Sequence, residues 1–265
     1  AGSRCAHQSS HHYQLCDNRC LGRLGRCGSV QPVRYQKLLA APTFMRDGLI
    51  EHIDREIEHA QQGNISAIIV KVNSLQDRDF IEALYRASAA GVRIQLIVRG
   101  ICSIRPGRKG LSENIEVRSI VGDLLEHSRL FYFHNNGDPQ IYTGSADAMA
   151  RSFIRRVESL FLIEDEVCKL ESMNVFLYNL KDNKNSYQMQ EDGSYQKLEA
   201  DDETTFDLHR EFYKVTRESL ENVEAELRKY VFGETEEHDL PALEYKEVAS
   251  ERTLSEERST TGDAM

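Results

Sequence analysis

His127 and Arg129 stand two residues apart at the start of an apolar run, residues 124–133, that predicts a strand. On a strand, side chains two residues apart project from the same face. A histidine can exchange a proton or accept a phosphoryl group near neutral pH, and an arginine beside it offers a planar fork of donors that fits phosphate oxygens. Arg99 ends another apolar run, residues 94–98. The three side chains predict a phosphate-handling site; the alternative is that the pair lies on a sheet edge without a role.

Further cations follow in two places. The segment 103–114 holds three of them around two glycines and a proline, namely Arg105, Arg108 and Lys109. A basic loop of this kind suits contact with a polyanion, and it suits a solvated turn equally well. Residues 155–161 predict a strand on which Arg156 and Glu158 share one face, with Val157 among the residues that pack around it.

An open α/β sheet would position these residues. Residues 65–72 and 92–98 are apolar and β-branched, as is typical of buried parallel strands. Asp77 can cap the helix between them. Such a unit crosses over right-handed and places Arg99 at the carboxyl end of a parallel strand, where these sheets bind ligands. The other predicted elements are helices at 44–62, 79–90, 164–177 and 205–232, a strand at 115–120, and hairpins that turn at 135–138 and 192–193. The first hairpin would bring residues 144–147 beside His127.

The bulk composition describes one sizeable α/β domain with appendages. The chain has 265 residues, 40% of them hydrophobic, and a net charge of −10. The acidic balance argues against a nucleic-acid partner, although it allows an anionic substrate in a local basic pocket. No stretch reaches the roughly 20 apolar residues of a membrane span, and the sequence has no secretory signal pattern. We therefore expect a cytoplasmic location with no integral membrane segment.

The N-terminal segment, residues 1–31, has little apolar periodicity and predicts loop or disorder. It contains four of the six cysteines and three histidines, but no Cys-x2-Cys pair. Zinc is therefore only weakly indicated, and no metal ligands are assigned. The histidines other than His127 are interpreted as surface or loop residues.

Several segments together resemble a known family in their order and spacing. They include Lys71-Val72-Asn73, Leu96-Ile97-Val98-Arg99-Gly100-Ile101-Cys102, Leu125-Glu126-His127-Ser128-Arg129, Ser145-Ala146-Asp147 and Arg155-Arg156-Val157-Glu158. From residue 32 to about residue 197 the chain resembles the C-terminal catalytic domain of the long-chain bacterial polyphosphate kinase.

The resemblance implies a phospholipase-D-like fold, a mixed sheet flanked by helices, in which two related halves each give one histidine motif to a shared site. It implies reversible transfer of the ATP γ-phosphate to polyphosphate through a phosphohistidine. By position, Arg99 would contact nucleotide phosphates, His127 would bind phosphate or move a proton, and Arg129 and Arg156 would line the polyanion channel. The implied partners are ATP, ADP and polyphosphate, with Mg²⁺ entering only with ATP. A homo-oligomer and peripheral attachment to a membrane stay open.

The chain also departs from the family pattern. The half that bears the autophosphorylated histidine has no match here, and residues 1–31 match nothing, which suggests a truncated or frame-shifted reading frame. We expect three parts: residues 1–31, the catalytic domain at 32–198, and an acidic helical extension with a disordered tail at 199–265. Alone, the chain should bind ATP weakly and make little polyphosphate. The alternatives are a non-catalytic module that binds polyanions or docks a partner, and a phosphodiesterase that uses His127, which Arg129 in place of a lysine disfavours.

Overall fold

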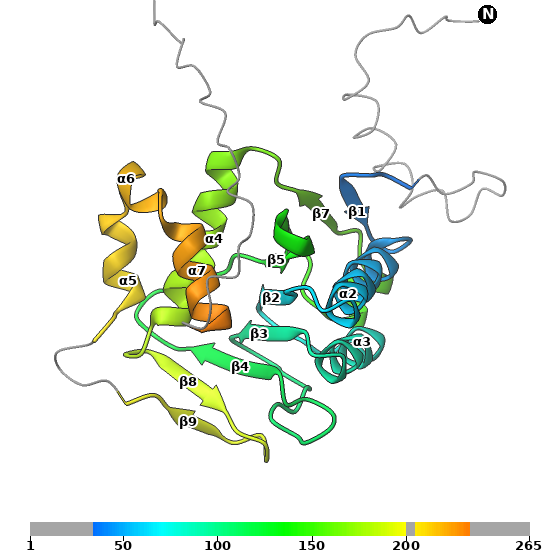
Figure 1. Cartoon of the computed structure of the whole chain (residues 1–265), viewed down its shortest axis with the longest axis horizontal. Coiled ribbons are helices and arrows are strands. Elements are labelled where there is room, and N and C mark those ends of the chain that lie inside the picture. Colours follow the sequence, from blue (N-terminus) through cyan, green and yellow to red (C-terminus); the bar gives the residue numbers. More distant parts are fainter. Residues whose placement is uncertain (1–33, 200–204, 234–265) are drawn as a thin grey trace, which may run out of the picture. The chain divides into compact units, whose positions relative to one another are not determined.

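The described strands form one mixed sheet. The computed structural model describes residues 34–199 and 205–233 (Figure 1). Within these residues nine strands run in the order β1-β7-β6-β5-β2-β3-β4-β8-β9. Their bounds are β1 (Leu38–Ala40), β2 (Ala67–Val72), β3 (Arg93–Val98), β4 (Ile115–Ile120), β5 (Leu130–Phe133), β6 (Gln140–Gly144), β7 (Ser159–Leu162), β8 (Ser186–Met189) and β9 (Tyr195–Lys197). The predicted mixed sheet flanked by helices is confirmed. The cysteine-rich segment and the acidic tail lie outside the described residues.

Strand β2 is the centre of the sheet, and all six of its residues are buried. It pairs in parallel with β3 and antiparallel with β5, and β3 pairs in parallel with β4. The connection from β2 to β3 is α3 (Arg78–Ala89), whose first turn is capped by Asp77, because its carboxylate accepts the Phe80 N–H at 3.1 Å. The predicted parallel unit and its cap are confirmed, and Arg99 directly follows β3.

Helices cover both faces of the sheet. On one face lie α2 (Met45–Gln61) and α3, and on the other lie α4 (Glu166–Lys181) and α7 (Val223–Phe232) (Figure 1). Side chains of β2 alternate between the two layers, so that Ile68 packs with α2 and α3 while Ile69 packs with α4 and α7. In the described part of the chain, no helix combines the length and apolarity that crossing a bilayer requires.

The predicted strand at 124–133 is wrong in its first half, because β5 begins only at Leu130. Its pairing with β2 ends at Leu130, opposite Lys71, and the preceding residues 121–129 form a loop. Leu125, which a buried strand would cover, is 75% exposed. His127 and Arg129 therefore lie in this loop and do not share the face of a strand. The reason is long-range, since the loop residue Glu126 forms an ion pair with Lys71.

The predicted strand at 155–161 also starts too early. Residues 151–155 form one helical turn, and β7 begins at Ser159. Val157 is 64% exposed, so it does not pack as predicted. Arg156 and Glu158 nevertheless lie near each other, with Arg156 Nη1 3.7 Å from Glu158 Oε1.

The predicted long helix at 205–232 is broken in the structure into α5 (Leu208–Glu211), a 3-10 turn at 212–214, α6 (Arg217–Leu220) and α7. The break follows from Thr216, whose extended backbone precedes a reciprocal cap. The Ser219 N–H donates to Thr216 Oγ1 at 3.3 Å, and the Thr216 N–H donates to Ser219 Oγ at 3.1 Å. The apolar residues of this segment pack into the core beneath α4, namely Leu220, Val223, Leu227 and Val231.

Three titratable side chains near the β5–β6 hairpin make the stability of the fold depend on pH. Burial lowers the pKa of His52 and of His134 to about 4 and raises the pKa of Glu56 to about 7. Between pH 4 and 6.5 both histidines bind protons in the unfolded chain but stay neutral in the folded chain, which favours unfolding. Glu56 has the opposite effect, because its carboxylate binds a proton more readily in the folded chain. Stability should therefore fall on acidification, by roughly 1–2 kcal/mol from pH 7 to 5, in urea unfolding.

The matched variant for this prediction is His52→Phe. The His52 ring packs against Phe133 and Tyr142, each with 5.0 Å between ring centroids, so phenylalanine keeps the ring contacts. In this variant only His134 destabilises the fold on acidification, and Glu56 offsets that effect. The free energy of unfolding of the variant should therefore be nearly equal at pH 7 and pH 5. A wild-type chain that gains stability on acidification would contradict this account.

Candidate functional site

The site lies at the carboxyl ends of β2 and β3, on a floor of main-chain hydrogen bonds. The Leu75 N–H donates to Ile101 O at 2.8 Å, the Ser103 N–H to Leu75 O at 2.9 Å, and the Gln76 N–H to Ala148 O at 2.8 Å. Loops that follow β2, β3 and β6 are thus joined side by side. At Gly100 a Cβ would lie 2.8 Å from Asn73 O, so this close approach requires glycine.

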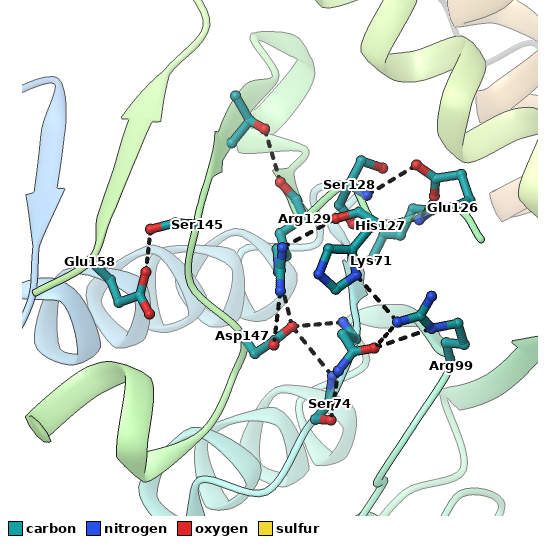
Figure 2. Close-up of polar contacts among 12 residues, drawn as sticks. Lys71, Ser74, Arg99, Glu126, His127, Ser128, Arg129, Ser145, Asp147 and Glu158 are labelled. Carbon is teal, nitrogen blue, oxygen red and sulfur yellow. Dashed lines mark hydrogen bonds and ion pairs between the residues drawn. The ribbon is translucent and has the colours of Figure 1, made fainter. Parts of the chain in front are cut away.

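Arg99 faces His127 across this floor (Figure 2). Its Nε donates to Asn73 Oδ1 at 3.1 Å, and its Nη2 contacts the same oxygen and lies 3.2 Å from His127 Nδ1. Among the described residues, the buried Arg99 Nη1 has no hydrogen-bond partner. A guanidinium donor without a partner, next to a histidine, is poised for an oxygen ligand.

The contact with Arg99 also determines the tautomer of His127. A guanidinium only donates, so Nδ1 must accept and Nε2 carries the ring proton. Desolvation first, then the charges of Arg129 and Arg99, lowers the pKa of His127. Near neutral pH the side chain is thus a neutral imidazole whose exposed Nε2–H can donate to a phosphate oxygen.

Asp147 holds Arg129 in place. Arg129 Nε and Nη2 donate to the two carboxylate oxygens of Asp147 at 3.2 and 3.3 Å. The same carboxylate accepts the N–H of Asn73 at 2.7 Å and of Ser74 at 3.4 Å. Arg129 Nη1 in turn donates to the carbonyl oxygen of His127 at 3.3 Å. Asp147 therefore connects the end of β2, through Arg129, to the loop that carries His127.

Lys71 is a site residue that the sequence interpretation missed. It is 5% exposed, and its Nζ forms an ion pair with Glu126 and donates to Ser128 O at 3.4 Å. The Ser128 N–H donates to Glu126 Oε1 at 3.0 Å, so the residues on both sides of His127 are braced. Burial, with Arg99 and Arg129 nearby, lowers the pKa of Lys71 to about 8. The sequence did contain a signal for this residue, namely a lysine within an otherwise apolar run that predicts a buried strand.

His209, from α5, lies against the same loop. It lies in a helix and is only 8% exposed, so its interpretation as a surface or loop residue is wrong. His134 lies in a loop, as predicted, but it is buried there. The Leu124 N–H lies 3.5 Å from His209 Nδ1, and His209 lines a cavity of about 30 Å³ together with Lys71 and His127. The segment after the sheet thus supports the loop that carries His127.

The contact of His209 with Gly122 makes a testable prediction. A Cβ at Gly122 would lie 2.4 Å from His209 Cε1, so Gly122→Ala should lower the free energy of unfolding by roughly 1–3 kcal/mol. Urea unfolding would measure the loss. In a His209→Ala background the same substitution should cost far less. Equal losses in both backgrounds would show that the two residues do not clash.

The other predicted site residues lie apart from Arg99, His127 and Arg129. Arg156 pairs with Glu158, which contacts Ser145 at one side of the site (Figure 2). Arg105 lies over the β8–β9 turn, because a Cβ at Gly193 would fall 1.0 Å from its Nη1. Arg108 and Lys109 are exposed in the basic loop. Within residues 34–199 and 205–233, no hydrogen bond or ion pair connects these four cations to His127.

Comparison with known proteins assigns a family to this arrangement. Residues 38–209 match the family model "Polyphosphate kinase C-terminal domain 2". The polyphosphate kinase of Synechocystis is 50% identical over 161 residues, which are 61% of this chain and 22% of that protein. The crystal structure of polyphosphate kinase from Porphyromonas gingivalis superimposes with a TM-score of 0.70 at 32% identity, over 80% of this chain and 31% of that one.

A phospholipase D family member, Nuc from Salmonella typhimurium, superimposes with a TM-score of 0.39 at 16% identity, over 53% of this chain and 89% of that one. The family assignment does not depend on it. The chain spans about a quarter of the length of the curated relatives it matches. On the family match and the superposition with a solved polyphosphate kinase, this chain belongs to the polyphosphate kinase family and carries its C-terminal domain 2.

Proposed function

We propose that this chain is the nucleotide- and polyphosphate-binding second half of a phosphotransferase that moves the γ-phosphoryl group of ATP, reversibly, to polyphosphate. The observation that carries the proposal is the pairing of Arg99, which has an unpartnered buried donor, with the neutral imidazole of His127. Family membership supports the substrate class, since the matched relatives are named polyphosphate kinases.

Each cation of the site has a role in this proposal. Arg99 meets phosphate oxygens with its free guanidinium edge. His127 donates from Nε2 to an oxygen on which negative charge develops during phosphoryl transfer. Arg129 and Lys71 are positioning residues, because Asp147 and Glu126 take up their donors and they act by holding the loop around His127. Fixed donors of this kind can each contribute ~10²-fold in rate. Arg156 and the basic loop would meet the polyphosphate chain outside the centre.

Magnesium belongs to the nucleotide in this proposal. Among the described residues, no group of three histidine, cysteine, aspartate or glutamate side chains could hold a metal ion. The carboxylate of Asp147, which holds Arg129 in place, is occupied by Arg129 and two main-chain amides. Mg²⁺ would therefore arrive with ATP, bound to its phosphates, and the protein would contribute cations around that complex.

The domain division, the oligomeric state and the location of the protein stay predictions. The division of the chain at residues 31 and 198, a homo-oligomer, and a cytoplasmic location with peripheral membrane attachment are all predictions. So is the phosphohistidine intermediate, whose nucleophile would come from the other half.

The test is calorimetric binding of tripolyphosphate and of MgATP to the 265-residue chain. The wild type should bind both, and His127→Gln, which keeps an uncharged amide of similar reach, should bind both several-fold more weakly. Salt-sensitive tripolyphosphate binding that is unchanged in His127→Gln and in Arg99→Ala would instead favour a non-catalytic polyanion module. Absence of binding to either ligand would exclude the proposed function.

A further inference from the structure

The loop that carries His127 rests on two supports from different parts of the chain. Residues 121–129 connect β4 to β5, and β2 and β3 lie between these two strands in the sheet. Because β2, β3 and β4 run parallel, the loop crosses the carboxyl ends of β2 and β3. Its second half lies over Lys71, which forms an ion pair with Glu126. Its first half lies against α5, at the left of Figure 1.

His209 is the side chain of α5 that supports the first half of the loop. The Leu124 N–H lies 3.5 Å from His209 Nδ1. The ring also packs against Gly122, because a Cβ there would lie 2.6 Å from Nδ1. The backbone of Gly122 is not left-handed, so the close approach of the ring is the reason for a glycine at this position. A polar contact and a packing contact thus join His209 to two residues of the loop.

The position of His209 is itself fixed by polar contacts at the start of α5. The His209 N–H donates to Asp207 Oδ1 at 3.2 Å. The Leu208 N–H donates to Asp182 Oδ2 at 3.0 Å, and the fully buried Asp182 also accepts the Asn185 N–H at 2.7 Å. The carbonyl oxygen of Asn185 accepts the N–H of the first loop residue at 2.9 Å. One buried carboxylate therefore joins α5 to the start of the loop, which makes α5 a fixed base for the ring.

We propose that His209 is a positioning residue for His127, because its ring holds the first half of the loop in the place where His127 meets Arg99. The inference rests on the proposed function and gives α5 a part in phosphate binding. His209 is only 8% exposed, so it acts through the loop and not on the ligand. Its Nδ1 can accept the Leu124 N–H only when that nitrogen carries no proton.

The loop needs this support because it buries little of its own surface. Leu124 and Leu125 are 50% and 75% exposed, and a segment with few buried apolar contacts opens at a low free energy. Lys71 binds the residues on either side of His127. The contact of His127 Nδ1 with Arg99 Nη2, at 3.2 Å, nevertheless tolerates little displacement. A shift of about 1 Å in a reacting group can cost 10²-fold in rate, so the second support matters for function.

The first readout is the titration of His127, followed by NMR on the full chain. In the wild type, desolvation and then the charges of Arg129 and Arg99 lower the pKa of His127. His209→Ala removes both contacts with the loop, so His127 should move away from the two arginines and its pKa should rise toward its ordinary value. The second readout is tripolyphosphate affinity by calorimetry, which should fall roughly five- to tenfold, the size of one lost hydrogen bond in the support.

Three further variants identify the cause of these changes. His209→Asn keeps an oxygen near the place of Nδ1, and His209→Phe keeps a ring without an acceptor. Each retains one of the two contacts, so both readouts should lie between those of the wild type and His209→Ala. Val223→Ala is the matched control, because it removes a buried side chain from the core beneath α4 in the same C-terminal segment. It should lower the stability of the segment and leave the titration of His127 and the affinity unchanged.

The outcomes separate this inference from the proposed function. An unchanged titration of His127 in His209→Ala would overturn the inference, whatever the affinity. An equal rise of the His127 pKa in Val223→Ala would overturn it as well, since the cause would then be a general loss of stability. A raised pKa with unchanged tripolyphosphate affinity would refute the part of α5 in phosphate binding. If the wild type failed to bind tripolyphosphate, the proposed function would fall, while the titration would still decide whether His209 positions His127.

Discussion

Arg99→Ala should weaken binding of tripolyphosphate and of MgATP to the chain by roughly 30- to 100-fold. Arg99 lines the small cavity that His127 also lines, and it has a buried Nη1 without a partner among the described residues. A charge-assisted hydrogen bond to a ligand contributes about 1.5–3 kcal/mol, and one guanidinium can make two of them. Calorimetric titration at fixed ionic strength would measure the loss.

Two further variants define the cause of that effect. Arg93→Ala removes the same charge from an exposed position at the opposite end of β3 and should change the affinity by less than about twofold, because charges far from the ligand are screened. Arg99→Lys keeps the charge but loses the planar fork, and its affinity should fall between those of the wild type and Arg99→Ala. If Arg99→Ala and Arg93→Ala weakened binding equally, Arg99 would only add to the general positive field.

Asp147→Ala should lower the free energy of unfolding by about 3 kcal/mol. The variant leaves Arg129, whose side chain is 17% exposed, without its carboxylate, and it leaves the Asn73 N–H without an acceptor. Removing one partner of a largely buried ion pair is costly because the other charge stays desolvated. Urea unfolding at pH 7 would measure the change.

Asp147→Asn provides the graded comparison, since an amide oxygen can still accept one main-chain N–H, and its loss should be clearly smaller. Asp123→Ala removes an exposed carboxylate from the loop that carries His127 and should stay within about 0.5 kcal/mol of the wild type. A loss for Asp147→Ala no larger than that for Asp123→Ala would rule out the anchoring role.

Much of the fold could be predicted because its signals are local. The apolar run that forms β2, the cap at Asp77 and the glycine turn at Gly193 each act within a few residues. The strand at 124–133 failed for the opposite reason. Its apolar residues suit a strand, but Glu126 forms an ion pair with Lys71, which lies far away in the sequence, and residues 121–129 form a loop.

The site residues also divide into those with a local sequence signal and those placed by long-range contacts. Arg99 could be identified because it directly follows a buried parallel strand, where open α/β sheets bind ligands. His127 could be identified by its residue type and its spacing from Arg129, although the strand predicted for the pair begins only at Leu130. Lys71 was missed because a charged residue within a strand is ordinarily interpreted as exposed, and only the packed structure shows it beneath the loop. The contact of His209 with the loop of Leu124 spans a long stretch of sequence and has no periodic signal.

The floor of hydrogen bonds around Leu75 has a consequence for the exchange of amide hydrogens with deuterium. The amides of Leu75, Gln76 and Ser103 lie in connecting segments, yet each donates to a carbonyl of a different loop, and Leu75 is fully buried. Such amides exchange only when several segments separate at once. Their protection should therefore approach that of β2 itself, so that the floor of the candidate site opens together with the sheet and not before it.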